Sequence, residues 1–249
     1  MKTLLFAVAA SAVLSTPAFA AELITNGGFE TGTFAGWSSN VQGGSNGNRF
    51  IDTPGTSTPA SGFGTAANGA GGNFYAVTDQ GGGGAYSLTQ LFTVASGTTS
   101  AILTFQMFAQ NQSGGGVIVN PAGLNFLAGA NQHARVDILT AGASAFTNAP
   151  GDIVANLYLG ADGSGVQPFQ NYSFNLLGLG LTAGNSYQIR FGQVDNQFFF
   201  QQGVDNVSIT TASVPEPANW ALMIAGFGLV GGAMRKTNGR RSTSVRFAV

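Results

Sequence analysis

The clearest strand signal in the chain is the run Ala101-Ile102-Leu103-Thr104-Phe105-Gln106-Met107-Phe108-Ala109-Gln110. Every second side chain of this run is apolar, namely Leu103, Phe105, Met107 and Ala109. Most of the side chains between them are polar. Because successive side chains of a β-strand point to opposite faces, this period of two predicts a strand with one face against a core.

Similar short runs recur along the chain, separated by turns rich in Gly and Asn. They predict further strands over residues 22–25, 73–78, 86–94, 117–119, 134–138, 153–159, 172–177, 187–191 and 204–210. No amphipathic helix lies between them, which argues against a parallel α/β fold because its crossover helices are missing. The pattern therefore predicts an all-β ectodomain, a jelly-roll β-sandwich over residues 21–213. Residues 38–72 are expected to be almost strandless, either as a binding loop or as a locally packed one.

Composition fits an exported β protein. The chain has 38 glycines in 249 residues and only 8% charged residues, where globular proteins average about 7% Gly and about 25% charged residues. Residues 21–217 carry three arginines against ten acids, a net charge of about −7. Such a segment lacks the clustered basic residues that nucleic acid requires. Cysteine is absent and there is one histidine, which excludes disulfides, thiolate metal sites and multi-histidine zinc centres.

Residues 1–20 are typical of a secretory signal peptide. Lys2 precedes an apolar core from Leu4 to Leu14, and Ala18-Phe19-Ala20 predicts cleavage before Ala21 by signal peptidase. The apolar core is too short for the alternative, an N-terminal membrane anchor. No twin arginine precedes it, which favours the general secretion machinery.

The C-terminal segment has the features of a membrane span. Residues 218–234 carry no formal charge, and at about 1.5 Å per residue they extend roughly 26 Å, the short end of what crosses a bilayer. Arg235, Lys236, Arg240 and Arg241 follow and would keep the far end cytoplasmic. The sequence thus predicts one transmembrane helix over 214–236 and a cytoplasmic basic tail over 237–249.

No catalytic set is predicted. His133 has no serine nearby in a strand-to-helix elbow, so a catalytic triad is not indicated. The ten acids leave a glycan hydrolase or lyase open as an alternative, although no pattern brings two carboxylates together in an aromatic cleft.

One acid falls on the apolar face of a predicted strand. Asp205 is in phase with Val207 and Ile209, so a regular pleat points its carboxylate toward the core. A carboxylate in that position needs a cation or several backbone donors.

The two ends of the ectodomain resemble those of galactose-binding-like jelly rolls, a group that includes carbohydrate-binding modules of bacterial glycosidases. The matching segments are Asn26-Gly27-Gly28-Phe29-Glu30-Thr31-Gly32 with Gly36-Trp37, and Val204-Asp205-Asn206-Val207-Ser208-Ile209. The resemblance implies adjacent terminal strands and a structural calcium, with Glu30 and Asp205 as ligands and Asn26 as a weaker one. Calcium takes such oxygen donors. The alternative is that both carboxylates accept backbone hydrogen bonds without a metal.

A glycan site is a further hypothesis. Sugar faces stack on exposed aromatic rings, while amide and carboxylate groups bond the hydroxyls. Residues of suitable type are Trp37, Tyr75, Tyr86 and the run Phe198-Phe199-Phe200, which is flanked by Asp195, Asn196, Gln197, Gln201 and Gln202. The alternative is that these aromatic residues belong to the core, and three consecutive Phe side chains must face both ways.

The C-terminal segment closely resembles the PEP-CTERM sorting signal of Gram-negative exopolysaccharide producers, in its Pro-Glu-Pro-x-x-Trp-Ala form. The match comprises Pro215, Glu216, Pro217, Trp220, Ala221, the Gly-rich apolar run and Arg235-Lys236; it departs in continuing to Val249. The resemblance implies processing by an exosortase near the Pro-Glu-Pro motif, after transient anchoring in the inner membrane with the ectodomain periplasmic. A plain anchor without processing is the alternative.

These observations favour a non-catalytic protein of the cell surface or extracellular matrix, associated with exopolysaccharide and biofilm. The alternatives are a calcium-stabilised carbohydrate-binding module and, from the enzyme class, a secreted glycan hydrolase or lyase. No cofactor other than calcium is expected.

Overall fold

The computed structural model describes residues 19–66, 71–112, 116–213 and 217–238. The chain divides into two compact units, one of which is Ala20–Ser213, while the other comprises the terminal segments. Most of the predicted signal peptide lies outside the described residues, as do Pro215, Glu216, Arg240 and Arg241.

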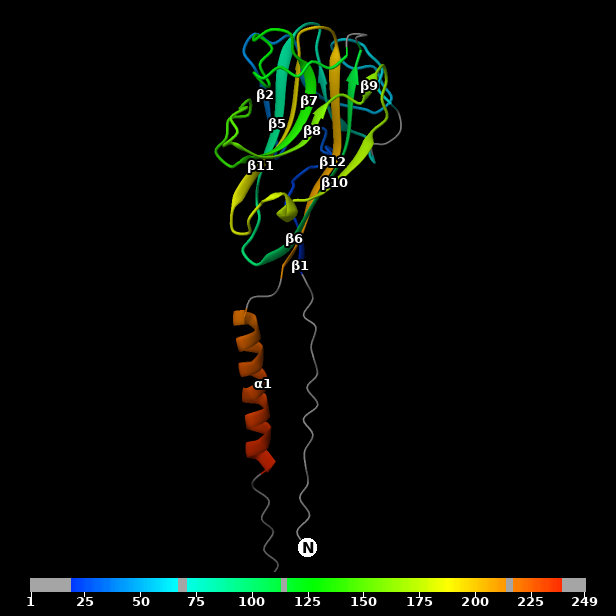
Figure 1. The fold of residues 1–249 in the computed structure, drawn as a ribbon. Helices are drawn as coiled ribbons and strands as arrows, with labels where there is room; N and C mark the ends of the chain where they lie inside the picture. Colours follow the sequence, from blue (N-terminus) through cyan, green and yellow to red (C-terminus); the bar gives the residue numbers. More distant parts are fainter. Residues whose placement is uncertain (1–18, 67–70, 113–115, 214–216, 239–249) are drawn as a thin grey trace, which may run out of the picture. The chain divides into compact units, whose positions relative to one another are not determined.

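Residues 20–213 form two mainly antiparallel sheets packed face to face (Figure 1). The larger sheet has the order β10-β6-β12-β4-β3, with β1 paired to β12 and the short β9 paired in parallel to β6. Its strands are β1 (Phe19–Glu22), β3 (Asn48–Asp52), β4 (Tyr75–Asp79), β6 (Thr98–Asn111), β9 (Gly163–Ser164), β10 (Gln170–Asn175) and β12 (Phe200–Ser213).

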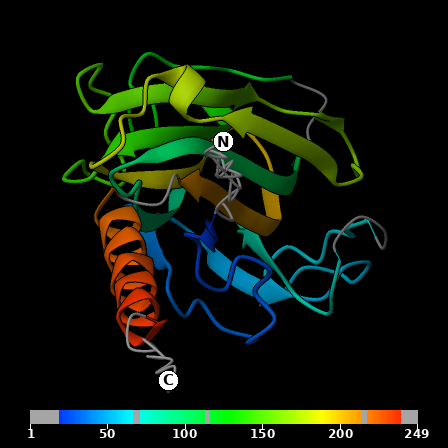
Figure 2. The ribbon, with the colours of Figure 1, turned by 90° about the horizontal axis from the view of Figure 1, so that it is seen from below.

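The smaller sheet has the order β2-β5-β11-β7-β8, and every pair in it is antiparallel. Its strands are β2 (Ser38–Val41), β5 (Gly84–Thr93), β7 (Gln132–Thr140), β8 (Ile153–Gly160) and β11 (Ser186–Asp195). A 3₁₀ turn, η1 (Leu177–Leu179), follows β10. Seen from below, the two sheets lie as separate layers (Figure 2). The all-β sandwich predicted from the alternating runs is therefore confirmed.

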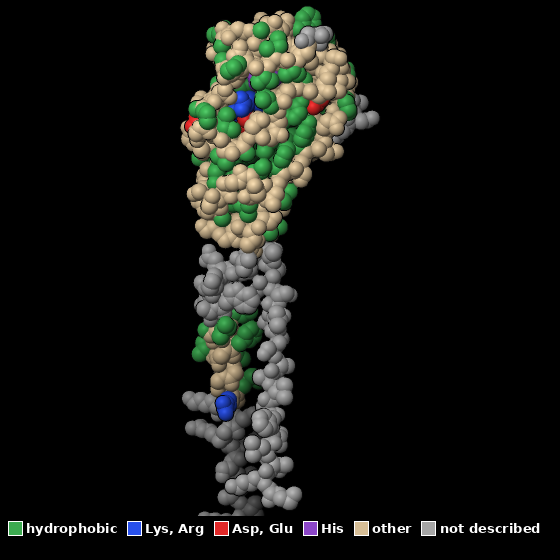
Figure 3. Space-filling model, viewed as in Figure 1, with side chains coloured by type: hydrophobic (Ala, Val, Ile, Leu, Met, Phe, Trp, Pro, Cys, Tyr) green, Lys and Arg blue, Asp and Glu red, His purple; other side chains and the backbone are tan. Residues whose placement is uncertain are grey.

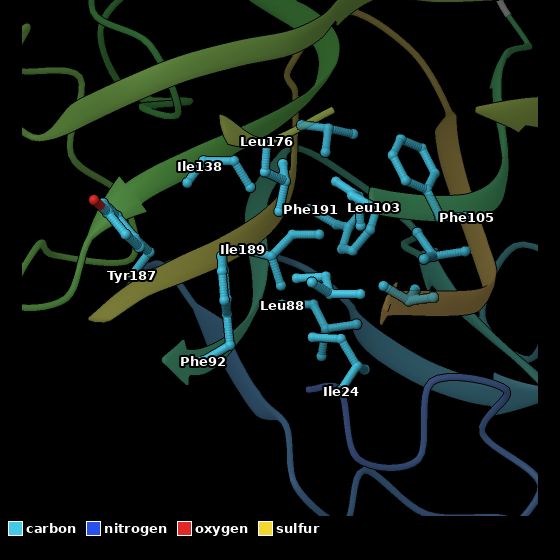
Figure 4. Close-up of a cluster of buried hydrophobic side chains, with 14 of the residues drawn as sticks. Ile24, Leu88, Phe92, Leu103, Phe105, Ile138, Leu176, Tyr187, Ile189 and Phe191 are labelled. Atoms are coloured by element: carbon cyan, nitrogen blue, oxygen red, sulfur yellow. The ribbon is translucent and has the colours of Figure 1, made fainter. Parts of the chain in front are cut away.

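The apolar core lies between the sheets (Figure 4). The predicted alternation of β6 is observed, since Leu103, Phe105 and Met107 are buried in this core. The ring of Phe105 meets Phe191 of β11 edge-on, with centroids 5.2 Å apart. Phe108 faces the other side of the larger sheet, where it packs in a separate cluster with Tyr75.

The interior turns polar toward the end of the sandwich where β11 ends and β12 begins, which we call the loop end. Thr78, Gln193 and Gln202 are buried there together with Arg49. The guanidinium of Arg49 donates to the Phe191 carbonyl and to Gln202 Oε1, both at 2.8 Å. A buried charge needs such acceptors to offset its lost hydration. Hydrogen bonds between buried polar groups thus add to the apolar packing at the loop end.

Three strand predictions are wrong. Of the strand expected over 22–25, only Glu22 belongs to one, as the last residue of β1. Residues 38–72 were expected to be almost strandless, yet they contain β2 and β3, which pair with β5 and β4. Both lie at sheet edges, where one side is solvated and an apolar run is not required. The strand expected over 117–119 is instead an isolated bridge between Ile118 and Gln132.

The second unit contains α1 (Pro217–Asn238). Pro217 opens this helix, a position that tolerates proline because the first turn lacks an acceptor for its amide. Within the described residues, no helix is both long enough and apolar enough to cross a membrane. The sequence predicted a transmembrane helix over 214–236. The described helix does not meet the requirement for one, since Asn219 and four glycines lower its apolar content.

Candidate functional site

A cavity of about 210 Å³ lies at the loop end of the sandwich. Two segments form its walls: Gly81–Gly83, between β4 and β5, and 195–199, which comprises the last residue of β11 and the connection to β12. The paired antiparallel strands β5 and β11 hold these segments side by side, because Asp195 is paired with Gly84. The cavity therefore has a rigid base on two adjacent strands.

Phe198 is the exposed aromatic side chain of this cavity, with 51% of its surface accessible. Its ring packs edge-on against Phe199 with centroids 5.4 Å apart, and Phe199 packs against Phe63 at 5.0 Å. Phe200, the first residue of β12, is fully buried. The three consecutive Phe side chains thus separate into one exposed ring, one bracing ring and one core ring.

Asp195 lines the cavity as its one carboxylate and is almost fully buried. Gln193 Nε2 donates to its Oδ1 at 2.9 Å. Burial raises the pKa of Asp195 to about 8, because the low-dielectric surroundings disfavour the charged form. At neutral pH the carboxyl group is therefore mostly protonated, and it offers one O–H donor and one carbonyl acceptor.

Asn196 has a positioning role. Its Nδ2 donates to the carbonyls of Phe126 and Gly129, and its Oδ1 accepts from the Asn131 amide at 2.8 Å. The side-chain amide thus fastens the 126–131 connection to the end of β11 and is occupied. The predicted glycan contact by Asn196 is corrected for that reason. Gln197, its neighbour, is exposed at the cavity wall.

The other aromatic residues predicted to contact glycan are buried. Tyr75 and Tyr86 are fully covered, and Trp37 is 7% exposed. The Trp37 ring lies between Phe29 and Phe191, at 5.6 and 6.1 Å, and the Tyr86 hydroxyl donates to the Asn46 carbonyl at 2.7 Å. None of the three presents a ring face to solvent, so the prediction that they stack on sugars is wrong. Phe198 belongs to the predicted Phe run, and its place in the connection between β11 and β12 distinguishes it from the buried Phe200.

The structure brings Glu30 and Asp205 together around Gly28. A Cβ atom on Gly28 would lie 3.8 Å from Glu30 Cγ, 3.9 Å from Asp205 Oδ1 and 3.3 Å from Asn206 Oδ1. Asn26 differs, since its Nδ2 donates to the carbonyls of Thr33 and Ala35 at 2.9 and 3.2 Å. Its amide thus holds its own loop, while the two carboxylates converge from opposite ends of the domain.

The environments of the two carboxylates differ. Glu30 accepts from the amides of Asn73 and Phe74 at 2.9 and 3.1 Å, and these bonds lower its pKa. Asp205 is almost fully covered, and burial, together with the nearby charge of Glu30, raises its pKa to about 7. Its Oδ1 accepts from the Asn206 amide at 2.7 Å. Two acids that disfavour each other's charge are stabilised by a cation between them.

A calcium ion fits this carboxylate pair only with help from other oxygens. The described residues contain no group of three or more His, Cys, Asp or Glu side chains suited to a metal. Calcium takes six to eight oxygen ligands, so carbonyl or amide oxygens such as Asn206 Oδ1 would complete the set.

Four further ionisable residues of the domain interior, Arg135, Asp137, Arg190 and His133, do not line the cavity. Asp137 accepts from Arg135 and Arg190, each at 2.7 Å, and all three are buried. His133 is buried, with Nδ1 3.4 Å from the Ile118 carbonyl, and burial lowers its pKa to about 4.

The described part of the predicted sorting motif lies on α1. Pro217 and Trp220 belong to its first turn, and Arg235 and Lys236 lie near its C-terminus, with Arg235 exposed.

No family model matches the sequence, and neither does any curated protein. Solved structures with similar folds include TmCBM61 in complex with β-1,4-galactotriose, 11% identical over 76% of this chain and 97% of that chain, with a TM-score of 0.44. The K3 cleaved adhesin domain of Lys-gingipain from Porphyromonas gingivalis W83 is 18% identical over 77% and 99%, with a TM-score of 0.46. The Stig cyclase Fisc from Fischerella sp. TAU is 18% identical over 79% and 100%, with a TM-score of 0.44. These similarities concern the fold alone.

Proposed function

We propose that this chain is an exported, non-catalytic surface protein whose jelly-roll β-sandwich binds glycans in the cavity at the loop end. One observation carries the proposal: an exposed, braced Phe198 ring and the Asp195 carboxyl group line the same cavity. Sugar rings combine apolar C–H faces with hydroxyl groups. A small cavity with an aromatic wall and a few polar groups suits such a ligand.

The carboxylate content of the cavity favours binding over hydrolysis. Glycosidases generally use two carboxyl groups, about 5–9.5 Å apart, on either side of the scissile bond. Among the described lining residues of the cavity, Asp195 is the one acid. A single protonated carboxyl group can orient a hydroxyl, but it lacks the partner that would act as nucleophile or base.

The direction of β12 suits display of the site. The strand begins at Phe200, next to the cavity, and ends at Ser213, just before the sorting segment. At about 3.3 Å per residue, its length is on the order of 45 Å. The cavity therefore lies at the opposite end of the sandwich from the point where the chain leaves toward α1.

Delivery to the surface is part of the proposal. Signal peptidase would release the chain before Ala21, and an exosortase would process it near Pro215-Glu216-Pro217, placing the domain on the surface or in the matrix of a Gram-negative bacterium. The exopolysaccharide made there would be its ligand. Replacing all three motif residues by Ala should leave the protein cell-associated and unprocessed on immunoblots. Unchanged processing and release would refute this delivery route.

A glycan array with the purified full-length chain in detergent tests the binding proposal. We expect retention of at least one oligosaccharide class and its loss in Phe198→Ala. Leu91→Ala is the matched control, because Leu91 is 58% exposed on β5 and lies outside the cavity. Failure of the wild-type chain to bind any glycan, or equal loss in both variants, would contradict the proposal.

A further inference from the structure

The domain offers almost no accessible cation to an acidic ligand. Residues 20–213 contain no lysine and three arginines, Arg49, Arg135 and Arg190. All three are buried and already bonded, Arg49 to Phe191 and Gln202 and the other two to Asp137. The face in Figure 3 is accordingly almost wholly hydrophobic or uncharged, with small acidic and basic patches.

The cavity itself also disfavours an acidic ligand. Asp195 is the titratable side chain among its lining residues, and the others are Gly, Asn, Gln and Phe. A uronate or sulfate entering here would lose hydration without gaining an ion pair, which is costly for a charged group. If Asp195 were ionised, the two charges would also repel. A hydroxyl or hydroxymethyl group at the same position meets no such penalty.

Size is the second constraint on the ligand. The cavity volume is about 210 Å³, below the roughly 300–1,000 Å³ of pockets that enclose drug-sized ligands. Its walls are two short connections that meet at the end of the sandwich, rather than an extended groove across a sheet. Such a cavity encloses one ring, and further sugar units would extend into solvent.

We propose that this cavity selects a single uncharged sugar ring at the end of a glycan chain and discriminates against uronic-acid and sulfated glycans. The inference rests on the proposed glycan-binding function and narrows its ligand class. It also narrows the ligand in the extracellular matrix to neutral polysaccharide or to neutral chain ends of a mixed polymer.

The test uses matched probes that differ only in oxidation at C6: gluco- against glucurono-oligosaccharides, and galacto- against galacturono-oligosaccharides. Binding of the full-length chain is measured in EDTA, which removes bridging cations, and again with calcium. Because Arg235 and Lys236 on α1 attract anions independently of the cavity, only the binding lost in Phe198→Ala is counted. We expect the neutral member of a bound pair to bind at least about tenfold more tightly, because the acidic member loses hydration without gaining an ion pair.

The length of the chain is the second variable. Lengthening the neutral oligosaccharide from two to four units should change its affinity by less than about threefold, since the added rings gain no enclosed contact.

The outcomes separate the two claims. Cavity-dependent binding of the acidic member that equals or exceeds that of the neutral member would overturn this inference and leave glycan binding intact. A tenfold gain for each added sugar unit would overturn its single-ring part, since it would indicate a groove. Absence of binding to every probe would overturn both this inference and the proposed function.

Discussion

The surroundings of Asp195 and Phe198 follow from the end of β11 and the connection after it. Asp195 is the last residue of β11 and Phe200 is the first of β12, so both follow the pleat and point into the sandwich. Phe198 lies in the connection between them and is free of that constraint. A single turn therefore places an exposed ring above a buried carboxyl group.

The ring of Phe198 should act by stacking rather than by general apolar contact. Phe198→Trp is expected to retain glycan binding, whereas Phe198→Leu should weaken it about 3- to 10-fold, because aromatic geometry contributes roughly 0.5–1.5 kcal/mol beyond burial. Isothermal titration with an oligosaccharide retained on the array measures this. The urea midpoint should stay unchanged, since the side chain is half exposed. Equal affinity of the Leu variant would exclude a stacking role.

Asp195 should make folding stability depend on pH. Its pKa is about 8 in the folded chain, against about 3.9 when unfolded, so the folded state binds the extra proton between these values. The stabilisation is present at low pH and is lost as the pH rises toward 8. In EDTA, the fall in unfolding free energy from pH 5 to pH 8 should be smaller in Asp195→Asn by about 1 kcal/mol or more. Identical profiles for both proteins would contradict the assignment.

At the scale of elements, the N-terminal turn is built onto the last strand. The Gly27 carbonyl accepts from the Val207 amide at 3.0 Å, and a Cβ on Gly27 would lie 1.8 Å from the Val207 carbonyl oxygen. The described chain has three non-glycine residues at positive φ, and all belong to these two segments: Asn26, Phe29 and Asn206. Such strained backbone persists where surrounding contacts over-determine it.

Glu30 fastens the segment before β4 to this turn, and Gly72 permits the contact. A Cβ on Gly72 would lie 2.0 Å from Glu30 Oε1. Gly72→Ala should therefore break the bonds from Asn73 and Phe74 to Glu30 and lower the melting temperature by several degrees. Gly43→Ala is the control, because its Cβ would meet no atom within 4 Å. Equal melting temperatures of the two variants would show that the Glu30 contact is dispensable.

The sequence predicts strands well where burial of one face makes apolar and polar residues alternate. The alternation in β6 and β11 gave correct strands because both central strands bury one whole face. The edge strands β2 and β3 were not predicted because pairing, rather than an apolar pattern, forms them.

The candidate site residues were harder to predict. Trp37, Tyr75 and Tyr86 were misassigned because residue type does not reveal which side of a sheet is covered. Convergence of Glu30 and Asp205 was expected from the resemblance to jelly-roll ends, although Asn26 turned out to serve its own loop.

At the scale of the whole molecule, the Glu30–Asp205 pair links the beginning of the domain to its last strand. Calcium should raise the melting temperature, and the gain should be larger at pH 8 than at pH 5, because Asp205 has a pKa of about 7 and binds metal when ionised. Asp205→Asn should abolish the gain. Differential scanning calorimetry with and without EDTA measures both effects. A calcium response that persists in Asp205→Asn would place the ion elsewhere.

The proposed function separates recognition from delivery. The cavity occupies the loop end of the sandwich, and the chain leaves from the other end of β12 toward the predicted sorting segment. The three arginines of residues 20–213 are internal, so the outer surface of the sandwich carries little charge to attract or repel a polymer at a distance. Selectivity must then arise from contacts within the cavity.

A crystal structure of the protein soaked with an oligosaccharide retained on the array tests that claim most directly. The account predicts one sugar ring against the face of Phe198, between Gly81–Gly83 and Gln197, with a hydroxyl bonded to Asp195. A sugar seated instead in the groove of Thr104, Gln106 and Tyr172 on the larger sheet, with the loop-end cavity empty, would contradict it.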